Sequence, residues 1–502
     1  MRLGVRAVGA IAGVTAAAVA LGIAEPVAVV TGARSSPLIA VDGVVVDKVP
    51  EAVKDAAIRV FGTYDKLALL IGTAVLLLAF AAVVGVLAVR RLWYGLAGIG
   101  VFGAIGVAAA LSRHGATWLY ALPSLVGALA GAGVMALLLR PPAEEAQAGA
   151  QRRQFLGLAG GALGVAALTG LAGRWWSTRH SVTAARAKVQ LPQPASPAAP
   201  LPAEVDFRVP KLAPYVTPNE DFYRIDTAFV VPQVAPDDWT LRIYGRVRKP
   251  LTLTYEQLVA RPMIERYITL ACVSNEVGGG LIGNARWLGV PIKDLLDEVE
   301  PEDGADQVVS RSVDGFTAGT PTAVLRDGRD AMLAVAMNGA PLPVNHGFPV
   351  RMVVPGLYGY VSATKWLAGL ELSTFDAFDA YWVRRGWDER APIKTQSRID
   401  TPQPGAQRAG RITVGGVAWA QHRGISKVEV RVDDGPWQAA RLAAVPSIDT
   451  WRQWMWVWDA TPGRHRLQVR ATDNGGQTQP EEPSDVFPNG ATGWHAIDVT
   501  VS

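Results

Sequence analysis

The sequence predicts a three-part chain: an N-terminal α-helical membrane domain, an α+β domain and a C-terminal all-β sandwich of immunoglobulin type. Apolar runs rich in Ala, Gly, Val and Leu dominate residues 1 to about 175, and the remainder has the composition of an ordinary soluble protein. Helix-like and strand-like runs then alternate to about residue 387, and only short strands follow from about residue 410. At 502 residues the chain is too long for one domain. The predicted parts are residues 1–140, 141–176, 177–204, 205–400 and 405–502.

Five stretches are long and apolar enough to cross a bilayer, which takes about 20 residues. They are Val8–Val30, Leu67–Val89, Leu92–Ser112, Ala116–Leu139 and Phe155–Gly173. Buried globular helices are the alternative, although Leu67–Val89 contains no charge at all. Flanking cations mark the cytoplasmic side, and those here are Arg2, Arg6, Arg90, Arg91, Arg140, Arg152 and Arg153. All of them agree on a topology in which segment Thr31–Asp65 and everything after the fifth span lie outside.

The fifth span, within residues 141–176, has the form of an export signal. Arg152-Arg153-Gln-Phe-Leu precedes a Gly/Ala-rich apolar stretch, as in a twin-arginine signal placed inside a chain. Two arginines could instead be ordinary topological flanks. No small-residue cleavage site follows clearly, so we expect the segment to remain as an anchor. Twin-arginine export carries folded proteins and suits an enzyme that acquires a bulky cofactor in the cytoplasm.

After a Pro/Ala-rich linker over residues 177–204, the exported part shows mixed elements. Strand-like runs at Leu241–Val247 and Val350–Val354 alternate with helical ones at Tyr255–Ala260 and Ile292–Val299. The last hundred residues alternate apolar and polar side chains and are divided by turns, as in an immunoglobulin-like sandwich. Their predicted strands are Arg411–Ala418, Lys427–Val432, Met455–Asp459 and Arg464–Ala471. Four tryptophans recur at strand spacing and are predicted as sandwich core plus an interface, namely Trp451, Trp454, Trp456 and Trp458.

Cys272 is the only cysteine, and it stands where a strand-like run breaks into a glycine-rich turn. A lone cysteine excludes an intrachain disulfide, a tetracysteine zinc site and an iron–sulfur cluster. It is often a small buried hydrophobe, but a polar turn after a strand suits a thiolate that binds a transition metal. The net charge of +4 is small and indicates no nucleic-acid partner. No predicted span contains a histidine pair for haem, and no flavin motif is visible.

Further motifs follow Cys272 and Asn275 in a fixed order. They are Met337-Asn-Gly-Ala-Pro-Leu-Pro, His346-Gly-Phe-Pro-Val-Arg-Met-Val-Val-Pro-Gly and Lys365-Trp. With these motifs, the chain from about Thr217 to its C-terminus resembles the sulfite oxidase family of molybdopterin enzymes. The resemblance implies a molybdopterin-binding α+β domain, a mononuclear molybdenum–molybdopterin cofactor, and an immunoglobulin-like domain that often mediates dimers.

The resemblance also implies roles for single residues. Cys272 would bind molybdenum, with Asn275 and Glu276 beside it at the catalytic centre. His346 and Arg351 would hold the phosphate and pterin of the cofactor, whose anionic groups suit cationic donors. The same pocket would be completed by Asn219, Tyr223, Arg224, Ser312, Ser362, Thr364 and Lys365. Taken singly, Arg351 could be an ion-pair partner and His346 the cap of a turn.

Three departures from the family bear on the substrate. Glu276-Val277 stand where sulfite oxidases carry an arginine pair, Ile225-Asp226-Thr227 where they carry Arg-Asn-His, and Phe316-Thr-Ala-Gly-Thr near the position of a pocket tyrosine. Sulfite and nitrate need cationic donors, and a carboxylate near the metal would repel a sulfite dianion. We therefore expect poor sulfite oxidation and a preference for a neutral or cationic substrate. The alternative is that Glu276 points into solvent.

The sequence thus predicts a membrane-anchored, extracytoplasmic molybdopterin oxidoreductase that transfers an oxo group to or from a sulfoxide, an N-oxide or a sulfur compound. Molybdenum would cycle between Mo(VI) and Mo(IV), and a separate cytochrome or quinone system would exchange the electrons. True sulfite oxidase or nitrate reductase activity is an alternative. A cofactor-free membrane-tethered binding or assembly protein is another, and a transporter with an accessory domain is a third. Membrane lipid and a second copy of the chain are the other expected partners.

Overall fold

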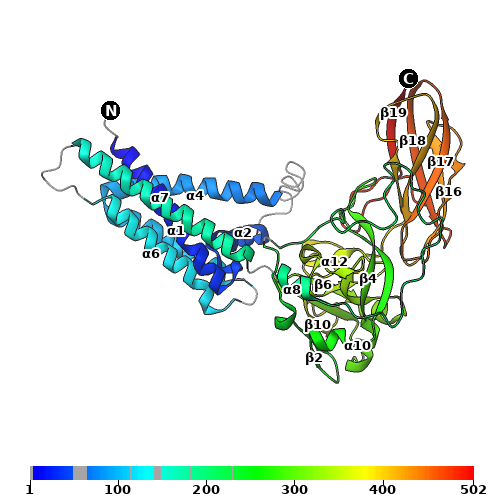
Figure 1. Ribbon diagram of the computed structural model, residues 1–502, viewed down its shortest axis with the longest axis horizontal. Helices are drawn as coiled ribbons and strands as arrows, with labels where there is room; N and C mark the ends of the chain where they lie inside the picture. The colour runs from blue at the N-terminus through cyan, green and yellow to red at the C-terminus, as the bar shows by residue number, and fades with distance from the viewer. Residues whose placement is uncertain (1–3, 49–64, 114–115, 141–147, 180–181, 229) are drawn as a thin grey trace. The chain divides into compact units, whose positions relative to one another are not determined.

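The computed structural model describes residues 4–48, 65–113, 116–140, 148–179, 182–228 and 230–502 (Figure 1). Its internal contacts divide the chain into two units. The first comprises Met1–Ser181 with Ala228–Val231, and the second comprises Val182–Thr227 with Pro232–Ser502.

The first unit is helical. It contains α1 (Val5–Thr31), η1 (Ala33–Ser35), α2 (Pro37–Lys48), α4 (Asp65–Arg90), α5 (Leu92–Leu111), η3 (Trp118–Ala121), α6 (Leu122–Leu138) and α7 (Ala148–Arg179). Among the described residues, five helices are long and apolar enough to cross a membrane, and they coincide with the five predicted stretches. The segment Thr31–Asp65, predicted to lie outside, contains α2 among its described residues, and its side of the membrane stays a prediction. That helix has 12 residues, which is too short to be recognised as a span.

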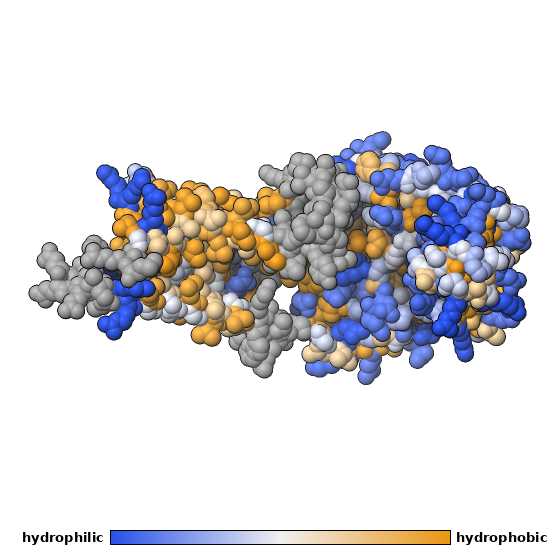
Figure 2. All heavy atoms as spheres, turned by 90° about the horizontal axis from the view of Figure 1, so that it is seen from above, coloured by the Kyte–Doolittle hydropathy of each residue, from blue (hydrophilic) through white to orange (hydrophobic). Residues whose placement is uncertain are grey.

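Small residues let the helices of this unit approach closely. A Cβ atom on Gly13 of α1 would lie 2.0 Å from the carbonyl oxygen of Ala81 on α4, and one on Gly85 would lie 2.1 Å from that of Gly9. Such contacts are typical of helices that associate in lipid. The outer faces expose large apolar side chains, with Leu76 72% and Leu129 74% exposed. Figure 2 shows apolar residues covering much of this unit, whereas the other unit is mainly hydrophilic.

The second unit begins with an α+β part built on two sheets. One sheet has the order β2-β1-β10-β5-β6, and the other has the order β3-β4-β7-β8, with β9 also paired to β7. The strands are β1 (Thr240–Gly245), β2 (Leu251–Thr254), β3 (Ile264–Ala271), β4 (Ile282–Pro291), β5 (Gln307–Ser312), β6 (Thr317–Pro321), β7 (Met332–Met337), β8 (Ala340–Pro341), β9 (Arg351–Val353) and β10 (Leu367–Ser373). The helices are α8 (Thr183–Lys188), η4 (Pro236–Asp238), α9 (Tyr255–Val259), α10 (Ile292–Val299), α11 (Thr322–Arg326), η5 (Val344–His346), α12 (Gly359–Ser362) and η6 (Val383–Arg385). The predicted helices and strands of this part are therefore confirmed to within a few residues.

Two further sheets enclose a separate apolar core at the C-terminal end. Their strand orders are β11-β13-β17-β16 and β12-β19-β18-β14-β15. The strands are β11 (Gln396–Thr401), β12 (Gly405–Gln407), β13 (Gly410–Trp419), β14 (Ile425–Val432), β15 (Gln438–Ala439), β16 (Arg441–Leu442), β17 (Arg452–Ala460), β18 (Gly463–Asp473) and β19 (His495–Val501). Trp454 and Trp458 of β17 lie in this core, whereas Trp451 packs in the core of the α+β part. The prediction of sandwich core plus interface for the tryptophans is confirmed for these three.

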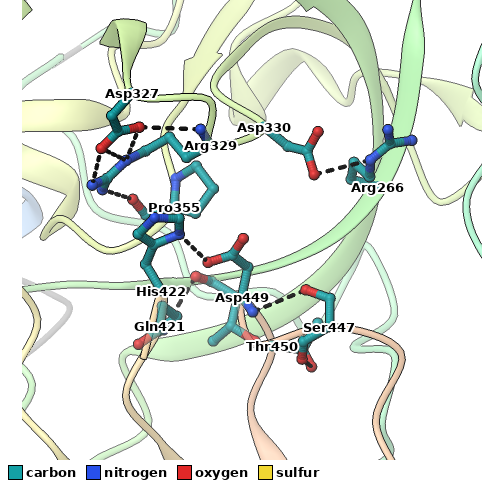
Figure 3. A network of polar contacts seen from close by, with 11 residues as sticks. Arg266, Asp327, Arg329, Asp330, Pro355, Gln421, His422, Ser447, Asp449 and Thr450 are labelled. Carbon is teal, nitrogen blue, oxygen red and sulfur yellow. Dashed lines mark hydrogen bonds and ion pairs between the residues drawn. The ribbon is translucent and has the colours of Figure 1, made fainter. Parts of the chain in front are cut away.

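Strand β3, whose last residue precedes Cys272, is attached to the sandwich through Thr269. The Thr269 N–H donates to Asp449 O at 2.9 Å, its carbonyl accepts from Gln421 Nε2 at 3.1 Å, and its hydroxyl accepts from the Trp451 N–H at 2.8 Å. Figure 3 shows the surrounding polar network, in which His422 Nδ1 lies 3.2 Å from Asp449 Oδ1. These three hydrogen bonds join β3 to segments far away in the sequence. Because hydrogen bonds are short and directional, the sandwich helps to fix the position of β3 and of the turn that follows it.

Candidate functional site

Cys272 follows β3 directly and begins a closed glycine-rich turn. Its N–H donates to Leu281 O at 2.9 Å, and its carbonyl accepts from Asn275 N at 3.1 Å. Asn275 is buried, and its Oδ1 accepts from Leu281 N at 2.7 Å across the turn. The half-buried thiol lines a cavity, and burial raises the pKa of Cys272. The turn thus presents one sulfur to an enclosed space instead of packing it in the core.

The cavity is formed by segments that lie far apart in the sequence. It is lined by Phe222, Tyr223, Ile225, Asp226, Thr227, Cys272, Val273, Ser274, Ser312, Asp314, Phe316, Arg351, Gly359, Tyr360, Ala363, Lys365, Trp366, Trp382 and Trp387. Five of these, Tyr223, Cys272, Ser312, Arg351 and Lys365, are predicted site residues that the fold brings together.

Arg351 is a buried cation whose protein hydrogen bonds go to backbone carbonyls. It is 4% exposed, and its guanidinium donates to His346 O at 3.2 Å and to Ala363 O at 3.4 Å. The guanidinium also lies 5.0 Å from the ring centroid of Trp287. Among the described residues, no carboxylate lies within ion-pair distance of it, which answers the alternative that Arg351 is an ordinary ion-pair partner. Burial lowers the pKa of Arg351 to about 10, so the group is still charged at neutral pH and favours an anion in the cavity.

Lys365 is the second cation of the cavity and is only 9% exposed. Its ammonium lies 3.2 Å from Asp226 Oδ2 and donates to Asn345 O at 3.1 Å. Burial lowers the pKa of Lys365 to about 8, against the opposing effect of the Asp226 carboxylate. Asp226 also pairs with Arg224 at 2.9 Å. The carboxylate therefore compensates Lys365 only in part, and the cavity retains a positive charge near Cys272.

Other predicted cofactor residues lie behind the cavity wall. His346 is buried, and its ring Nε2–H donates to Asn219 O at 3.2 Å, while its Nδ1 has no hydrogen-bond partner among the described residues. Burial, with Arg351 and Lys365 nearby, lowers the pKa of His346 to about 3, so the ring is neutral. Its carbonyl accepts from Arg351. In this structure His346 orients that arginine.

Asn219, Arg224, Ser362 and Thr364 are likewise absent from the cavity lining. Ser362 Oγ donates to Leu357 O at 3.1 Å and Tyr358 O at 2.9 Å, which holds α12 against the preceding turn. Thr364 Oγ1 shares a 2.7 Å hydrogen bond with Ser310 Oγ. Asn219 Oδ1 accepts from Asn338 at 2.8 Å, and the Arg224 side chain is 41% exposed. These four residues support the wall and do not form its surface.

The expectation that Glu276 acts near the metal is not supported by its position. Glu276 is exposed and does not line the cavity, whereas Cys272, Val273 and Ser274 do. The Gly279 N–H donates to Glu276 O at 2.9 Å, so a tight turn directs the chain away directly after Asn275. Glu276 therefore faces solvent, as the alternative expected, and its carboxylate does not stand in the cavity to repel a sulfite dianion.

The other two departures from the sulfite oxidase pattern do line the cavity. Ile225, Asp226 and Thr227 occupy one part of its wall, and Phe316 occupies another. Sequence reasoning missed five aromatic residues and one acid: Phe222, Tyr360, Trp366, Trp382, Trp387 and Asp314. The Tyr381-Trp382-Val-Arg-Arg-Gly-Trp387 cluster of aromatic and cationic residues was the available signal for two of them.

Comparisons with known proteins find relatives among the molybdopterin-dependent oxidoreductases. A family model described as oxidoreductase molybdopterin binding domain matches residues 228–382. Sulfite oxidase of Gallus gallus is 31% identical over 335 residues, covering 56% of this chain and 72% of that one. Mitochondrial sulfite oxidase of Homo sapiens is 29% identical over 341 residues, covering 57% of this chain and 62% of its own length. An uncharacterized oxidoreductase of Bacillus subtilis, YuiH, is 34% identical over 154 residues, covering 30% of this chain and 73% of that one.

Among solved structures, the sulfane dehydrogenase SoxCD from Paracoccus pantotrophus shares the fold. It has a TM-score of 0.51 and 24% identity, covering 58% of this chain and 82% of that chain. The fold, the cavity and the relatives define a molybdopterin-binding oxidoreductase. The chain belongs to the sulfite oxidase family of molybdenum-dependent oxidoreductases.

The residues present fit the cofactor that this family implies. A half-buried thiol, the buried guanidinium of Arg351 and the ammonium of Lys365 face one cavity. A thiolate is a natural ligand for a transition metal, and forked and point cations suit an anionic phosphate. When bound, the cofactor supplies two-electron oxo-transfer chemistry. The protein contributes the charges, the hydrogen bonds and the enclosure.

Proposed function

We propose that this protein is a membrane-anchored oxidoreductase whose α+β part acts outside the cytoplasm on a small neutral or cationic oxo donor or acceptor. The observation that carries the proposal is the opening of Cys272 into one cavity with two buried cations, Arg351 and Lys365. In this reading Cys272 binds molybdenum, and Arg351 and Lys365 bind anionic parts of molybdopterin. Tyr223 and Ser312 line the same space, while Asn219, Arg224, Asn275, His346, Ser362 and Thr364 position the wall.

The substrate class follows from what the wall lacks. Ile225, Asp226 and Thr227 line the cavity where sulfite oxidases carry Arg-Asn-His. These three residues supply neither the arginine nor the histidine of sulfite oxidases, and the Asp226 carboxylate is paired with Lys365 and Arg224. A sulfoxide or an N-oxide needs no such cation. Its reduction consumes two electrons and two protons and yields the reduced compound and water, with a cytochrome or quinol supplying the electrons.

The membrane assignment is supported by the helical unit. Five helices have the length and composition of spans, and side chains such as Leu76 and Leu129 are largely exposed. Apolar surface of this extent is unfavourable in water and favourable in lipid. The arginines of the connecting segments favour a topology that places the second unit outside the cytoplasm. We also propose that the two C-terminal β-sheets form a sandwich of immunoglobulin type, and that two copies of the chain associate through it, as the resemblance to the sulfite oxidase family implies.

The test is the cofactor content of the purified full-length protein. We expect one molybdenum and one pterin per chain, and loss of the metal in Cys272→Ser with an unchanged near-UV circular dichroism spectrum. Arg452→Met is a suitable control for a matching Arg351→Met variant. Arg452 is likewise bonded to backbone carbonyls, at 2.6 Å and 2.8 Å, but it is only half-buried and lies in the sandwich. Full metal content in Cys272→Ser would contradict the assignment, as would equal loss in both arginine variants.

A further inference from the structure

One side of the cavity is aromatic, and its residues are not among those proposed to bind the cofactor. Phe316, Tyr360, Trp382 and Trp387 line it. The ring centroids of Trp382 and Trp387 are 6.2 Å apart with their planes at 76°, and those of Tyr360 and Trp387 are 5.9 Å apart. We call these four residues the aromatic wall. Phe316, Trp382 and Trp387 are half-buried, so part of each ring remains available to a ligand, whereas Tyr360 is 9% exposed and belongs to the core behind them.

The aromatic wall is held in place by contacts outside the cavity. The Tyr360 hydroxyl donates to Asp388 O at 2.5 Å, and the Trp387 N–H donates to Trp382 O at 3.2 Å around a turn at Gly386. Phe487 of the sandwich packs against Trp387 with ring centroids 5.4 Å apart. Because these supports do not depend on a ligand, the rings are preorganised, which lowers the entropy lost on binding.

The charge beside the aromatic wall is negative. Asp314 lies in the turn between β5 and β6 and lines the cavity, and its Oδ1 accepts from Phe316 N at 3.1 Å. No ion pair joins Asp314 to a cation in the part of the chain that the structure describes. Asp226, the other acid of the cavity, is already paired with Lys365 and Arg224. Asp314 is thus the carboxylate that remains for a ligand once Arg351 and Lys365 hold the cofactor.

Arg385 lies close to this wall but does not line the cavity. Its guanidinium stacks on Tyr381 at 3.7 Å from the ring centroid and donates to Tyr381 O at 2.7 Å. The guanidinium also lies 5.9 Å from the ring centroid of Trp382, a residue of the aromatic wall. These contacts show that the rings of this segment accept a cation on their faces.

We propose that the aromatic wall and Asp314 form an outer subsite for a methylated cationic group. The inference rests on the proposed function and names its substrate class: an oxide that carries a positive charge on or beside its oxidised atom, such as a tertiary amine N-oxide. Aromatic faces attract cations through their quadrupole, and a carboxylate adds charge attraction in a partly desolvated site. The same faces disfavour sulfite and nitrate.

The test compares choline with 3,3-dimethylbutan-1-ol, which has the same shape without the charge. Isothermal titration calorimetry on the full-length holoprotein in detergent is expected to show tighter binding of choline, by about tenfold. Asp314→Asn and Trp382→Leu should abolish the difference, and Trp382→Phe should retain part of it. Trp437→Leu is the control, because Trp437 packs against Trp494 in the sandwich. Sulfite should not compete with choline.

Equal binding of the two compounds would overturn the subsite, as would a difference that survives both Asp314→Asn and Trp382→Leu. Loss of molybdenum from Asp314→Asn would assign this carboxylate to the cofactor and also overturn it. The proposed function has its own test, because it requires molybdenum in the unmodified protein whatever the Asp314 and Trp382 variants show. A protein without the metal that still prefers choline would keep the subsite and lose the enzyme assignment.

Discussion

Replacing Arg351 by methionine should separate cofactor binding from stability. Burial lowers the pKa of Arg351 to about 10, roughly two and a half units below its usual value. Each unit corresponds to about 1.36 kcal/mol, so the buried charge destabilises the folded apoprotein by about 3 kcal/mol. The penalty is fully present at pH 7, below both the folded and the unfolded pKa, and it disappears only as the pH rises through the interval between them.

Arg351→Met removes this penalty together with three long hydrogen bonds and a ring contact, each worth about 1 kcal/mol. These effects offset one another, so the free energy of unfolding of the apoprotein should change by about 1 kcal/mol or less. Cofactor binding loses charge-assisted hydrogen bonds and should weaken by about 100-fold or more. Arg452→Met should do the reverse, with about 2 kcal/mol of destabilisation from two lost hydrogen bonds and normal cofactor content.

The assay is urea unfolding of the detergent-solubilised full-length apoprotein, followed by tryptophan fluorescence, together with metal and pterin analysis of the holoprotein. Destabilisation of the apoprotein by more than about 3 kcal/mol, with normal cofactor content, would refute the reasoning. Arg351 would then be an ordinary structural residue whose charge is already compensated.

Three further outcomes are expected. Replacing Arg152-Arg153 by Lys-Lys should leave a periplasmic-only reporter fused after Pro197 inactive, and normal export would mean that the pair is only topological. Burial raises the pKa of Asp473, but hydrogen bonds from Arg423 and from nearby groups outweigh it and leave the pKa lowered. This carboxylate should therefore stabilise the fold above pH 4 and cease to do so as the pH falls through its folded pKa, and Asp473→Asn should flatten the acid limb of the unfolding profile. Glu276→Arg should leave sulfite turnover unchanged, since the side chain is exposed, and a large gain would restore Glu276 to the catalytic centre.

The pattern of residues along the chain was sufficient to predict most of the helices and strands and to recognise the family. The apolar stretches predicted as spans appear as helices, because hydropathy over about 20 residues is a property of the segment itself. The alternating C-terminal runs appear as strands for the same reason. Cys272 and Arg351 could be recognised because each stands within a short, specific motif. Helix α2 was missed because its 12 residues carry too little local signal.

Only the tertiary structure decided which residues face the cavity. Glu276 and Ser274 are two residues apart, yet one turn places Ser274 in the lining and Glu276 outside it. Trp382 and Trp387 lie more than a hundred residues after Cys272 but share its cavity. Hydropathy and motifs describe neighbours along the chain, whereas a cavity wall is made by long-range packing. The charge and shape that select a substrate are therefore properties of the fold.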